Sequence, residues 1–417
     1  MNIFQKKESN VRSYCRMYSG MFDRAKGSIV YSSDGKRFID FFVGAGVLNY
    51  GHNNDFIKSK IVSYIASDRI VHALDFHTVA KKDFIQCFSK KILKPKGLNY
   101  KFQFCGPTGA DAAEASIKLA RKVKKRSGIF AFMGGYHGVS LGALSVTGNK
   151  KMRNAGGVPL NNVTFIPYYH RNFDSIKYME TILKDSHSGI ETPAAVIVET
   201  IQAEGGVNVA PIDWLEQLKD VCEKYDMLFI CDDIQVGCGR SGNFFSFERS
   251  RVVPDIVILS KALSGYGLPM SVLLLKPELD VWKPGEHVGT FRGFQLAFVG
   301  AVAALEYREK YDLENKVKER ELFIENFLYH LQSPYPTDDT VNGFKFETRG
   351  LGMIWGIDFG DGAITEKIVK RCFNRGLIIE SAGRNGSVLK LMPPLNISMN
   401  DLKTGCLTIE EAVSKIL

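Results

Sequence analysis

The 417-residue sequence contains no run of about eighteen consecutive apolar residues, the length that a membrane-spanning helix requires. Its first ten residues are polar and charged and lack the apolar stretch of a secretion signal. Its eight cysteines are scattered, without a CxxC pair or a metal-type spacing to histidine. These absences argue against a membrane protein, a metal site and a disulfide framework. We therefore expect a cytoplasmic protein.

The sequence also lacks internal repeats, low-complexity tracts and a nucleic-acid recognition motif. The net charge is +9, but the lysines and arginines are spread along the chain. The densest basic run, residues 122–126, falls at the C-terminal end of a predicted helix, where cations complement the helix dipole. We therefore expect neither a nucleic-acid nor a membrane partner. A hydrophobic content of 45% and a charged content of 24% are typical of a globular protein.

The order of apolar and polar residues predicts an α/β protein. Helices and strands alternate from about residue 80 to residue 300, which is typical of a mainly parallel sheet covered on both faces. The predicted strands of this region are residues 101–105, 128–133, 194–199, 227–232 and 256–259. The predicted helices include residues 54–66, 112–125, 214–225, 296–311 and 313–331.

The two ends of the chain follow other patterns. Residues 29–41 predict a β-hairpin. Beyond residue 310 the sequence predicts an α+β unit, with strands near 353–358 and 387–391 and a helix at 364–375. We expect residues 1–55 to contribute to a small domain, residues 56–310 to form a large domain, and residues 311–417 to form the C-terminal small domain.

Lys261 follows the predicted strand at residues 256–259, among small and glycine residues. Removing its ammonium group from water costs several kcal/mol. One outcome is a lysine with a lowered pKa that forms a Schiff base with a carbonyl cofactor. The simpler outcome, which the strand favours when taken alone, is a lysine that reaches solvent.

A second motif joins the predicted strand at 101–105 to the next predicted helix. Thr108, Gly109 and Ala110 are small residues whose backbone N–H groups can approach an anion. Together with the positive end of the helix they predict a phosphate-binding turn. The simpler interpretation is that Asp111 caps the helix and Gly109 serves the turn. The two interpretations are compatible.

Two adjacent acids, Asp232 and Asp233, end a predicted strand. Successive side chains of a strand point to opposite sides, so one acid can face a ligand at the carboxyl edge of the sheet. An ordinary solvated pair is the alternative. Residues 237–242 then match GxGxxG, but the aromatic residues 243–248 do not predict the helix that a dinucleotide site requires. An oxidoreductase therefore stays a minor alternative.

Tyr136 and His137 stand between glycines after the predicted strand at 128–133. Such aromatic residues stack on a planar ring or, in the simpler interpretation, are packed into the core. Residues 202–206, 289–293 and 390–395 form three further motifs, each of which is weak alone.

Taken together and in this order, the motifs resemble those of the class III (ω-) aminotransferases, which depend on pyridoxal 5′-phosphate. The resemblance covers residues 27–395, and the spacing between Asp232 and Lys261 agrees with the family's aspartate–lysine interval. It implies the fold of the type I pyridoxal phosphate-dependent transferases: an α/β large domain with a mainly parallel, seven-stranded sheet, and a small α+β domain from both termini.

The resemblance also implies roles for the site residues. Lys261 would form the Schiff base and move the substrate proton, and Asp232 would pair with the ring nitrogen. Tyr136 would stack on the ring, and Gln235 would lie near its 3-oxygen. The implied cofactor-binding residues are Thr108, Gly109, Ala110, Tyr136, His137, Asp232, Gln235, Lys261 and Thr290. Thr290 would reach the phosphate in the partner subunit of a homodimer; whether dimers pair into tetramers stays open.

The substrate-binding residues implied by the resemblance are Glu204, Lys390 and Arg292. Glu204 resembles the family glutamate that gates between the amino donor and the dicarboxylate. Many class III enzymes have an arginine where this chain has Lys390, and lysine cannot form a bidentate fork with a carboxylate. Arg292 or Arg240 could supply that fork instead.

Five stretches are most similar to the diaminobutyrate–2-oxoglutarate transaminases within this family: residues 8–16, 232–240, 263–269, 282–287 and 290–293. This implies amino transfer between L-2,4-diaminobutyrate and 2-oxoglutarate, in ectoine, siderophore or peptide-antibiotic pathways. The alternatives are an ornithine-, 4-aminobutyrate- or lysine-type aminotransferase, a mutase, racemase or decarboxylase on the same fold, and a non-catalytic protein.

Overall fold

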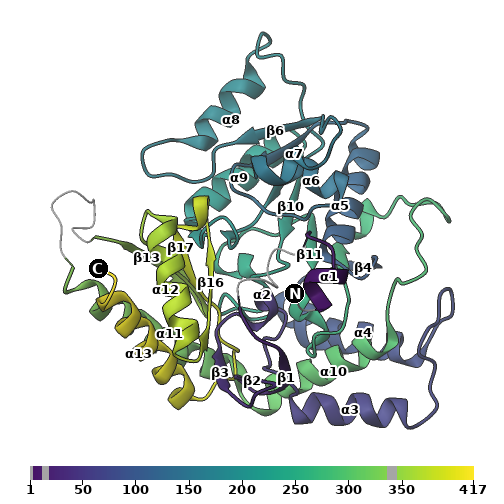
Figure 1. Cartoon of the computed structure of the whole chain (residues 1–417). Coiled ribbons are helices and arrows are strands. Elements are labelled where there is room, and N and C mark those ends of the chain that lie inside the picture. The colour runs from purple at the N-terminus through teal and green to yellow at the C-terminus, as the bar shows by residue number, and fades with distance from the viewer. Residues whose placement is uncertain (1–2, 12–17, 336–344) are drawn as a thin grey trace.

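A seven-stranded sheet organises the larger part of the structure, a computed structural model that describes residues 3–11, 18–335 and 345–417 (Figure 1). Its strands lie in the order β4 (Lys101–Phe104), β12 (Val272–Leu275), β11 (Ile256–Leu259), β10 (Leu228–Asp232), β7 (Ala195–Val198), β5 (Ile129–Phe132) and β6 (Val163–Ile166). From β11 to β6 all neighbours are parallel, whereas β12 is antiparallel to both of its neighbours. The predicted mainly parallel sheet is confirmed.

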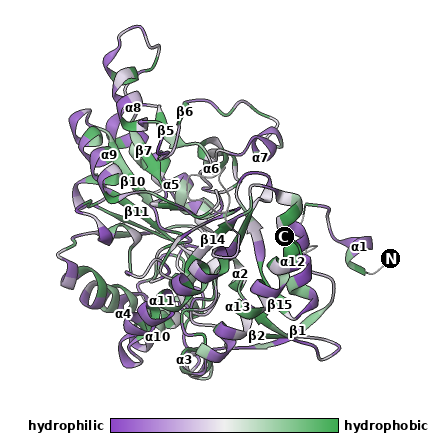
Figure 2. Ribbon diagram, turned by 90° about the vertical axis from the view of Figure 1, so that its left-hand side faces the viewer, coloured by the Kyte–Doolittle hydropathy of each residue, from purple (hydrophilic) through white to green (hydrophobic). Residues whose placement is uncertain are grey.

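Both faces of this sheet are buried. Alternate residues of each strand belong to different cores, so that Ile230 of β10 faces one core and Phe229 faces the other. Helices α5 (Gly109–Lys124) and α6 (Leu141–Val146) supply the first core. The second core includes residues of α4 (Val79–Phe88), α8 (Ser175–Lys184), α9 (Ile212–Lys224) and α10 (Gln295–Lys310). Figure 2 shows the apolar character of the central strands.

Segments from both ends of the chain build the smaller part of the structure. Strands β13 (Glu347–Leu351), β14 (Ile354–Asp358), β17 (Val388–Leu391) and β16 (Glu380–Ala382) form an antiparallel sheet. A second sheet joins β1 (Phe22–Lys26), β2 (Ile29–Ser32) and β3 (Arg37–Asp40) to β15 (Leu377–Ile378). The pairing of N- and C-terminal strands supports a small domain built from both ends of the chain. The exact domain boundaries stay a prediction.

The remaining elements surround these sheets. They are α1 (Ile3–Lys7), α2 (Val43–Gly46), α3 (Asp55–Ile65), α7 (Lys150–Asn154), α11 (Leu313–Gln332), α12 (Gly362–Asn374), α13 (Met399–Ser414), β8 (Ile201–Gln202) and β9 (Asn208–Val209). The predicted hairpin and the predicted helices and strands lie within a few residues of observed elements. Elements that the sequence did not predict include β6 and β12 of the large sheet, β13, β15 and β16 of the smaller sheets, and the helices α4, α6, α8 and α13. Residues 12–16 of the motif at 8–16 lie outside the described residues.

The start of α5 differs from its prediction. The helix begins at Gly109 and not at residue 112, and its N-cap is Thr108. The Asp111 backbone N–H donates to Thr108 Oγ1 at 3.3 Å, and the Thr108 backbone N–H donates to Asp111 Oδ2 at 3.0 Å. Asp111 therefore closes a capping box from inside the helix, and its prediction as the N-cap was wrong.

Residues 237–242, which match GxGxxG, form turns. The next helical element is the short 3₁₀ helix Ser246–Arg249. The rejection of a dinucleotide-binding fingerprint is confirmed, because that fingerprint requires a helix to begin at the glycines.

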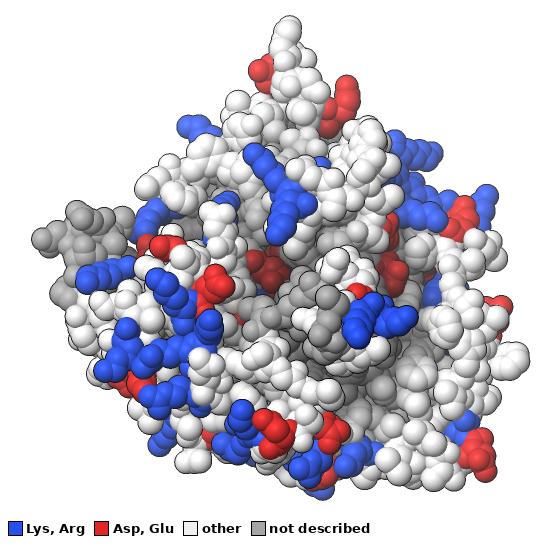
Figure 3. All heavy atoms as spheres, viewed as in Figure 1, with Lys and Arg blue, Asp and Glu red and all other residues white. Residues whose placement is uncertain are grey.

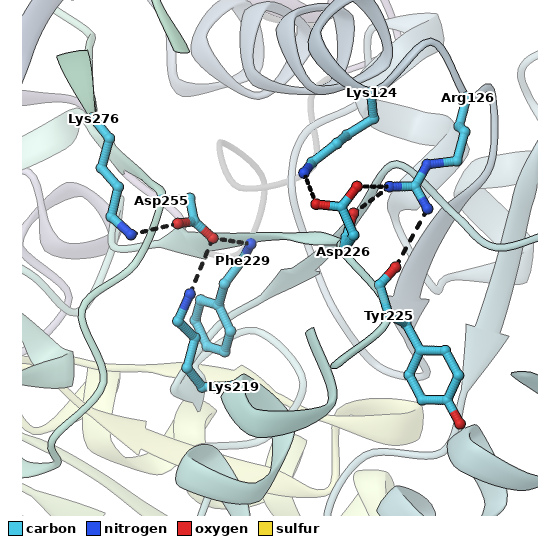
Figure 4. A network of polar contacts seen from close by, with 8 residues as sticks. All are labelled: Lys124, Arg126, Lys219, Tyr225, Asp226, Phe229, Asp255 and Lys276. Carbon is cyan, nitrogen blue, oxygen red and sulfur yellow. Dashed lines mark hydrogen bonds and ion pairs between the residues drawn. The ribbon is translucent and has the colours of Figure 1, made fainter. Parts of the chain in front are cut away.

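Strand β11 is anchored at its start by Asp255 (Figure 4). The Asp255 carboxylate accepts the backbone N–H of Phe229 at 2.8 Å and pairs with Lys276 at 2.6 Å and Lys219 at 3.2 Å. Burial opposes the charged carboxylate, but the lysines outweigh burial and lower the pKa of Asp255. The contact ties β11 to β10, to α9 and to the residue after β12, and so fixes the strands that carry the site.

The surface carries charges of both signs (Figure 3). On the face shown, lysine and arginine side chains gather most over the region of α12 and α13. Within the described part of the chain, no helix is both long enough and apolar enough to cross a membrane.

Candidate active site

A cavity of about 320 Å³ lies at the carboxyl ends of the strands of the large sheet, where open α/β proteins bind ligands. It is lined by Thr108, Gly109, Ala110, Tyr136, His137, Gly138, Val139, Glu199, Glu204, Asp232, Ile234, Gln235 and Lys261. The cavity therefore brings together every predicted cofactor-binding residue except Thr290. Its volume falls in the usual range of small-molecule sites.

The turn between β4 and α5 forms one wall of the cavity. Gly109 and Ala110 are the first residues of α5, where backbone N–H groups have no partner within the helix and the helix dipole is positive. Gly138 packs against this turn so closely that a Cβ there would lie 2.6 Å from the Cβ of Ala110. This wall suits a phosphate group, which accepts hydrogen bonds from such N–H groups.

Asp232 is buried at the end of β10 and holds His137. Its Oδ2 lies 2.6 Å from His137 Nδ1, and its Oδ1 accepts the backbone N–H of Ile234 at 3.1 Å. Burial opposes a charged ring, but the bond to Asp232 and its charge outweigh burial and raise the pKa of His137. A carboxylate offers about four acceptor positions, so Asp232 can accept a further donor from the cavity.

Asp233 turns to the other side of the strand. Its carboxylate accepts the backbone N–H of Ser246 at 2.9 Å and a bond from the Ser246 hydroxyl. Burial raises the pKa of Asp233 to about 7. The prediction that the two acids point to opposite sides is confirmed.

Lys261 follows β11 with φ of 45°, a left-handed conformation that strains any residue except glycine. Its Nζ donates to the carbonyl oxygen of Ala45 at 3.0 Å. That carbonyl comes from a left-handed turn in which Val43 and Ala45 have φ of 45° and 56°. Burial is the largest influence on the amine, and it lowers the pKa of Lys261 although the charge of Glu204 opposes it. Lys261 therefore lines the cavity and does not end at open surface.

Gln235 connects Lys261 to the rest of the site. Its Nε2 donates to the carbonyl oxygen of Ala45 at 2.8 Å and to Glu204 Oε1 at 3.1 Å. Its Oε1 is buried and has no hydrogen-bond partner among the described residues. A buried acceptor left without a partner costs about 1–3 kcal/mol, so this oxygen marks a place where a ligand donor fits.

Lys390 lies fully buried beside the cavity. Its Nζ is 2.6 Å from Glu204 Oε1 and 2.9 Å from Glu380 Oε1. Burial opposes the ammonium, but the two carboxylates outweigh burial and raise the pKa of Lys390. Burial also opposes the charge of Glu204, but Lys390 and Lys261 lower its pKa to about 2. Lys390 is thus a charged residue that is already paired in this structure.

Three predicted substrate or cofactor residues lie elsewhere. Thr290 and Arg292 are in the segment before α10 and do not line the cavity. Arg292 donates to the carbonyl oxygen of His287. Arg240 is fully buried and donates to Asn49 Oδ1 at 2.6 Å and to the carbonyl oxygen of Met353 at 2.9 Å. Arg240 therefore fixes loops from the two parts of the structure to each other, and the proposal that it forms a carboxylate fork was wrong.

The sequence reasoning missed Glu199 and Glu380. Glu199 lines the cavity and accepts the backbone N–H of Tyr136 at 2.8 Å, and burial raises its pKa to about 7. Glu199 follows the apolar residues 194–198, much as Lys261 follows the apolar residues 256–259. The same signal, a charged residue at the end of an apolar strand, could have found Glu199. Glu380 follows the apolar residues 377–379 and offered a similar, weaker signal.

The residues of the cavity fit pyridoxal 5′-phosphate, the cofactor that the resemblance implies. The N-terminus of α5 suits its phosphate, and the close approach of Gly138 to Ala110 shapes the turn. Asp232 keeps an acceptor position for a protonated ring nitrogen. The unpartnered Oε1 of Gln235 can accept the ring hydroxyl. Lys261 supplies an amine of lowered pKa for the aldehyde.

Comparison with known proteins extends over nearly the whole chain. The family profile described as aminotransferase class-III matches residues 12–413. A diaminobutyrate–2-oxoglutarate transaminase of Bordetella parapertussis is 48% identical, covering 100% of this chain and 96% of that protein. One from Halalkalibacterium halodurans is 45% identical, covering 100% and 97%. The crystal structure of an ornithine aminotransferase from Toxoplasma gondii superposes with a TM-score of 0.84 at 23% identity, covering 99% of this chain and 94% of that one. The structural likeness confirms the predicted fold.

Proposed function

This chain belongs to the class-III aminotransferases, which are pyridoxal phosphate enzymes, and we propose that its substrates are L-2,4-diaminobutyrate and 2-oxoglutarate. The products are L-aspartate 4-semialdehyde and glutamate, formed in two alternating half-reactions. The observation that carries the proposal is one cavity that joins Lys261, Asp232 and the N-terminus of α5. The substrate pair comes from the relatives of 45% and 48% identity named above.

The walls of the cavity would hold the cofactor. Thr108, Gly109 and Ala110 bind its phosphate through the start of α5. Asp232 holds a proton on the ring nitrogen, and the bond from His137 fixes the orientation of that carboxylate. Tyr136 would pack against the ring, and its backbone N–H is held in place by Glu199.

Lys261 attaches the cofactor through Nζ and later moves a proton. When bound, pyridoxal phosphate supplies an aldehyde for the amine and a ring that accepts the electron pair of the deprotonated carbon. When free, Lys261 Nζ would take the proton from the substrate carbon that bears the amino group. Burial lowers the pKa of Lys261 and so favours the neutral amine that this step requires.

We place the enzyme in a homodimer with shared active sites. Thr290 is exposed, and its carbonyl oxygen accepts a bond from His72 Nε2 at 2.9 Å. Large apolar side chains close to His72 and Thr290 in the sequence are also exposed, among them Phe76 at 65%, Val288 at 68% and Phe291 at 69%, and the Phe291 ring lies 5.5 Å from that of His72. Such a patch is typical of an interface. Sedimentation velocity at several protein concentrations tests the dimer, and a monomer at micromolar concentration contradicts it.

The compartment and the pathway are part of the same proposal. The cysteines of the described residues are free thiols, which suits a cytoplasmic enzyme. The diaminobutyrate made by the reverse reaction would serve ectoine, siderophore or peptide-antibiotic synthesis.

A panel of amino donors tests the proposed reaction. The cofactor-loaded enzyme is given diaminobutyrate, ornithine, 4-aminobutyrate or lysine with 2-oxoglutarate, and glutamate formation is followed. We expect the highest kcat/KM with diaminobutyrate. A higher value for another donor reassigns the substrate, and turnover without any acceptor indicates a mutase, racemase or decarboxylase. A protein that gains no absorbance band with pyridoxal phosphate would be non-catalytic.

A further inference from the structure

Glu204, Lys390 and Glu380 form a buried group that we call the charge cluster. Lys390 of β17 and Glu380 of β16 are cross-strand partners, and their side chains are 0% and 1% exposed. Glu204 comes from the turn between β8 and β9, which form a separate two-stranded sheet, and it is 19% exposed. Of the three residues only Glu204 lines the cavity. The cluster therefore has one member that a substrate can reach and two members behind it.

The cluster has two acids for one ammonium group. Lys390 lies within 3 Å of both carboxylates, at 2.6 Å from Glu204 and 2.9 Å from Glu380. Neither oxygen of Glu380 has a hydrogen-bond partner of good geometry among the described residues. When Glu380 is ionised, the single positive charge of Lys390 is shared between two carboxylates. Glu204 is then less fully neutralised than it would be if Lys390 paired with Glu204 alone.

The oxygens of Glu204 are unequally used. Both Lys390 Nζ and Gln235 Nε2 donate to Oε1, at 2.6 Å and 3.1 Å. Within the described residues no donor reaches Oε2. An accessible carboxylate oxygen without a donor, in a cluster that lacks one positive charge, is a site for a cationic group.

We propose that Glu380 is a specificity-determining residue, which acts through Lys390 to make Glu204 bind the second ammonium group of a diamino donor. The proposal rests on the proposed function, because a donor must first be an aminotransferase substrate. A diamino acid keeps one ammonium group while the other amino group reacts. That retained ammonium completes a cluster of two acids and two cations.

The proposal separates two donors that differ in one group. Diaminobutyrate and 4-aminobutyrate have the same carbon chain, carboxylate and terminal amine, but only diaminobutyrate has an α-ammonium. The acceptor 2-oxoglutarate also lacks an ammonium group. The cluster therefore favours diaminobutyrate through that one group, whereas the cofactor-binding residues treat both donors alike.

The electrostatic surroundings of Glu380 give the proposal a pH dependence. The groups that face it are Lys390 of β17, Glu204, Lys261 after β11 and Tyr18 of the N-terminal segment. Burial raises the pKa of Glu380 to about 7, with Lys390 opposing and Glu204 reinforcing the shift. Glu380 is charged above that pH and neutral below it. The preference for diaminobutyrate therefore weakens as the pH falls from 7.5 to 6.

Glu380→Gln tests the proposal, because glutamine keeps the shape of the side chain and removes its charge. We measure kcat/KM for diaminobutyrate and for 4-aminobutyrate, with 2-oxoglutarate as acceptor, between pH 6 and pH 7.5. In the variant we expect the ratio of the two values to fall about tenfold at pH 7.5 and to become independent of pH. The matched control is Glu366→Gln, an exposed glutamate of α12, which keeps the wild-type ratio.

Other outcomes overturn the inference. An unchanged donor ratio in Glu380→Gln contradicts it, and so does an equal fall for both donors, which indicates a structural role. The thermal midpoint and the cofactor absorbance of the variant identify that second case. If the wild-type enzyme prefers 4-aminobutyrate, the proposed substrate itself is wrong. If wild type and Glu380→Gln prefer diaminobutyrate by the same ratio, the role proposed for Glu380 is wrong but the proposed substrate stands.

Discussion

Two lysines of this site lie in regions of opposite electrostatic character. Lys261, at the edge of the large sheet, donates to a backbone carbonyl at 3.0 Å, and burial lowers its pKa. Lys390, in the small antiparallel sheet, lies between two carboxylates, which raise its pKa. Both follow or interrupt an apolar strand, so their sequence surroundings are alike. Burial beside a neutral acceptor favours the neutral base at Lys261, whereas two carboxylates keep Lys390 a cation.

The difference shows how one cavity separates reaction from recognition. A base must give up its charge, so it needs burial and neutral hydrogen-bond acceptors. A cation that holds a recognising carboxylate such as Glu204 must keep its charge, so it needs nearby acids. Exchanging these surroundings would remove both functions.

The largest effect is expected from Lys261→Ala. The variant loses the attachment point and the proton-transferring amine together, so turnover with diaminobutyrate falls by at least about a thousandfold. Glutamate formation at saturating substrates is the measurement.

Lys151→Ala is the matched control, because this exposed lysine of α7 lies outside the cavity. It keeps wild-type turnover. Circular dichroism verifies that Lys261→Ala remains folded. Full activity of a folded Lys261→Ala enzyme would contradict the assignment of the base.

The next largest effect is expected from Asp232→Asn. The amide keeps the size of the side chain but removes the charge that stabilises a protonated ring nitrogen, and kcat falls by between about 10²- and 10³-fold. Its bond to His137 Nδ1 also changes character, because Asp232 no longer supplies the charge that raises the pKa of that ring. Pre-steady-state absorbance measures the half-reaction. A wild-type rate in Asp232→Asn would contradict the proposed electrostatic role of Asp232.

The Lys261 side could be predicted from the sequence because its signals are local. Lys261 and Asp232 each stand at the end of an apolar run, and the carboxyl ends of parallel strands meet at one sheet edge. Thr108 and Gly109 were found in the same way, between a strand and a helix. The structure added the Ala45 carbonyl, the exact start of α5 and Glu199.

On the Lys390 side, Glu204 and Lys390 were predicted as substrate residues, but their arrangement with Glu380 could not be predicted because it depends on strand register. Glu380 faces Lys390 only because β16 and β17 pair residue 380 with residue 390 across a short turn. A shift of one residue would move either side chain to the other face of the sheet. Lys390 was singled out as a departure from its family, but its partner Glu380 lay in a strand that the sequence did not predict.

Lys390→Met tests that side of the comparison through stability. Methionine fills a similar volume but leaves Glu204 and Glu380 facing each other without a cation, which costs about 2 kcal/mol because Glu204 is partly exposed. Urea unfolding at pH 8 measures the loss. The loss shrinks as the pH falls to 6, because the unpaired acids then take up protons.

The double variant Lys390→Met/Glu380→Gln is the control for charge. It lacks one of the two unpaired acids and regains about half of the lost stability at pH 8. A double variant as unstable as Lys390→Met would show that lost packing, and not charge, causes the effect.

The smallest effect on activity is expected from Asp233→Asn, which sharpens the comparison because Asp233 adjoins Asp232 but points to the other side of β10. Burial raises its pKa from 3.8 to about 7, so the folded protein binds a proton there that the unfolded chain has lost above pH 4. The stability that this proton contributes is therefore complete below pH 4 and is lost as the pH rises to 7. An asparagine does not titrate, so between pH 5 and pH 7 the variant gains stability relative to wild type, by at most about 1.4 kcal/mol per pH unit.

Urea midpoints at pH 5, 6 and 7 measure this gain, and kcat stays at the wild-type value because Asp233 does not line the cavity. If kcat of Asp233→Asn fell as it does in Asp232→Asn, a charge on one face of β10 would affect the reaction on the other face. The opposite pKa shifts of Lys261 and Lys390 would then depend on more distant charges as well as on their immediate partners.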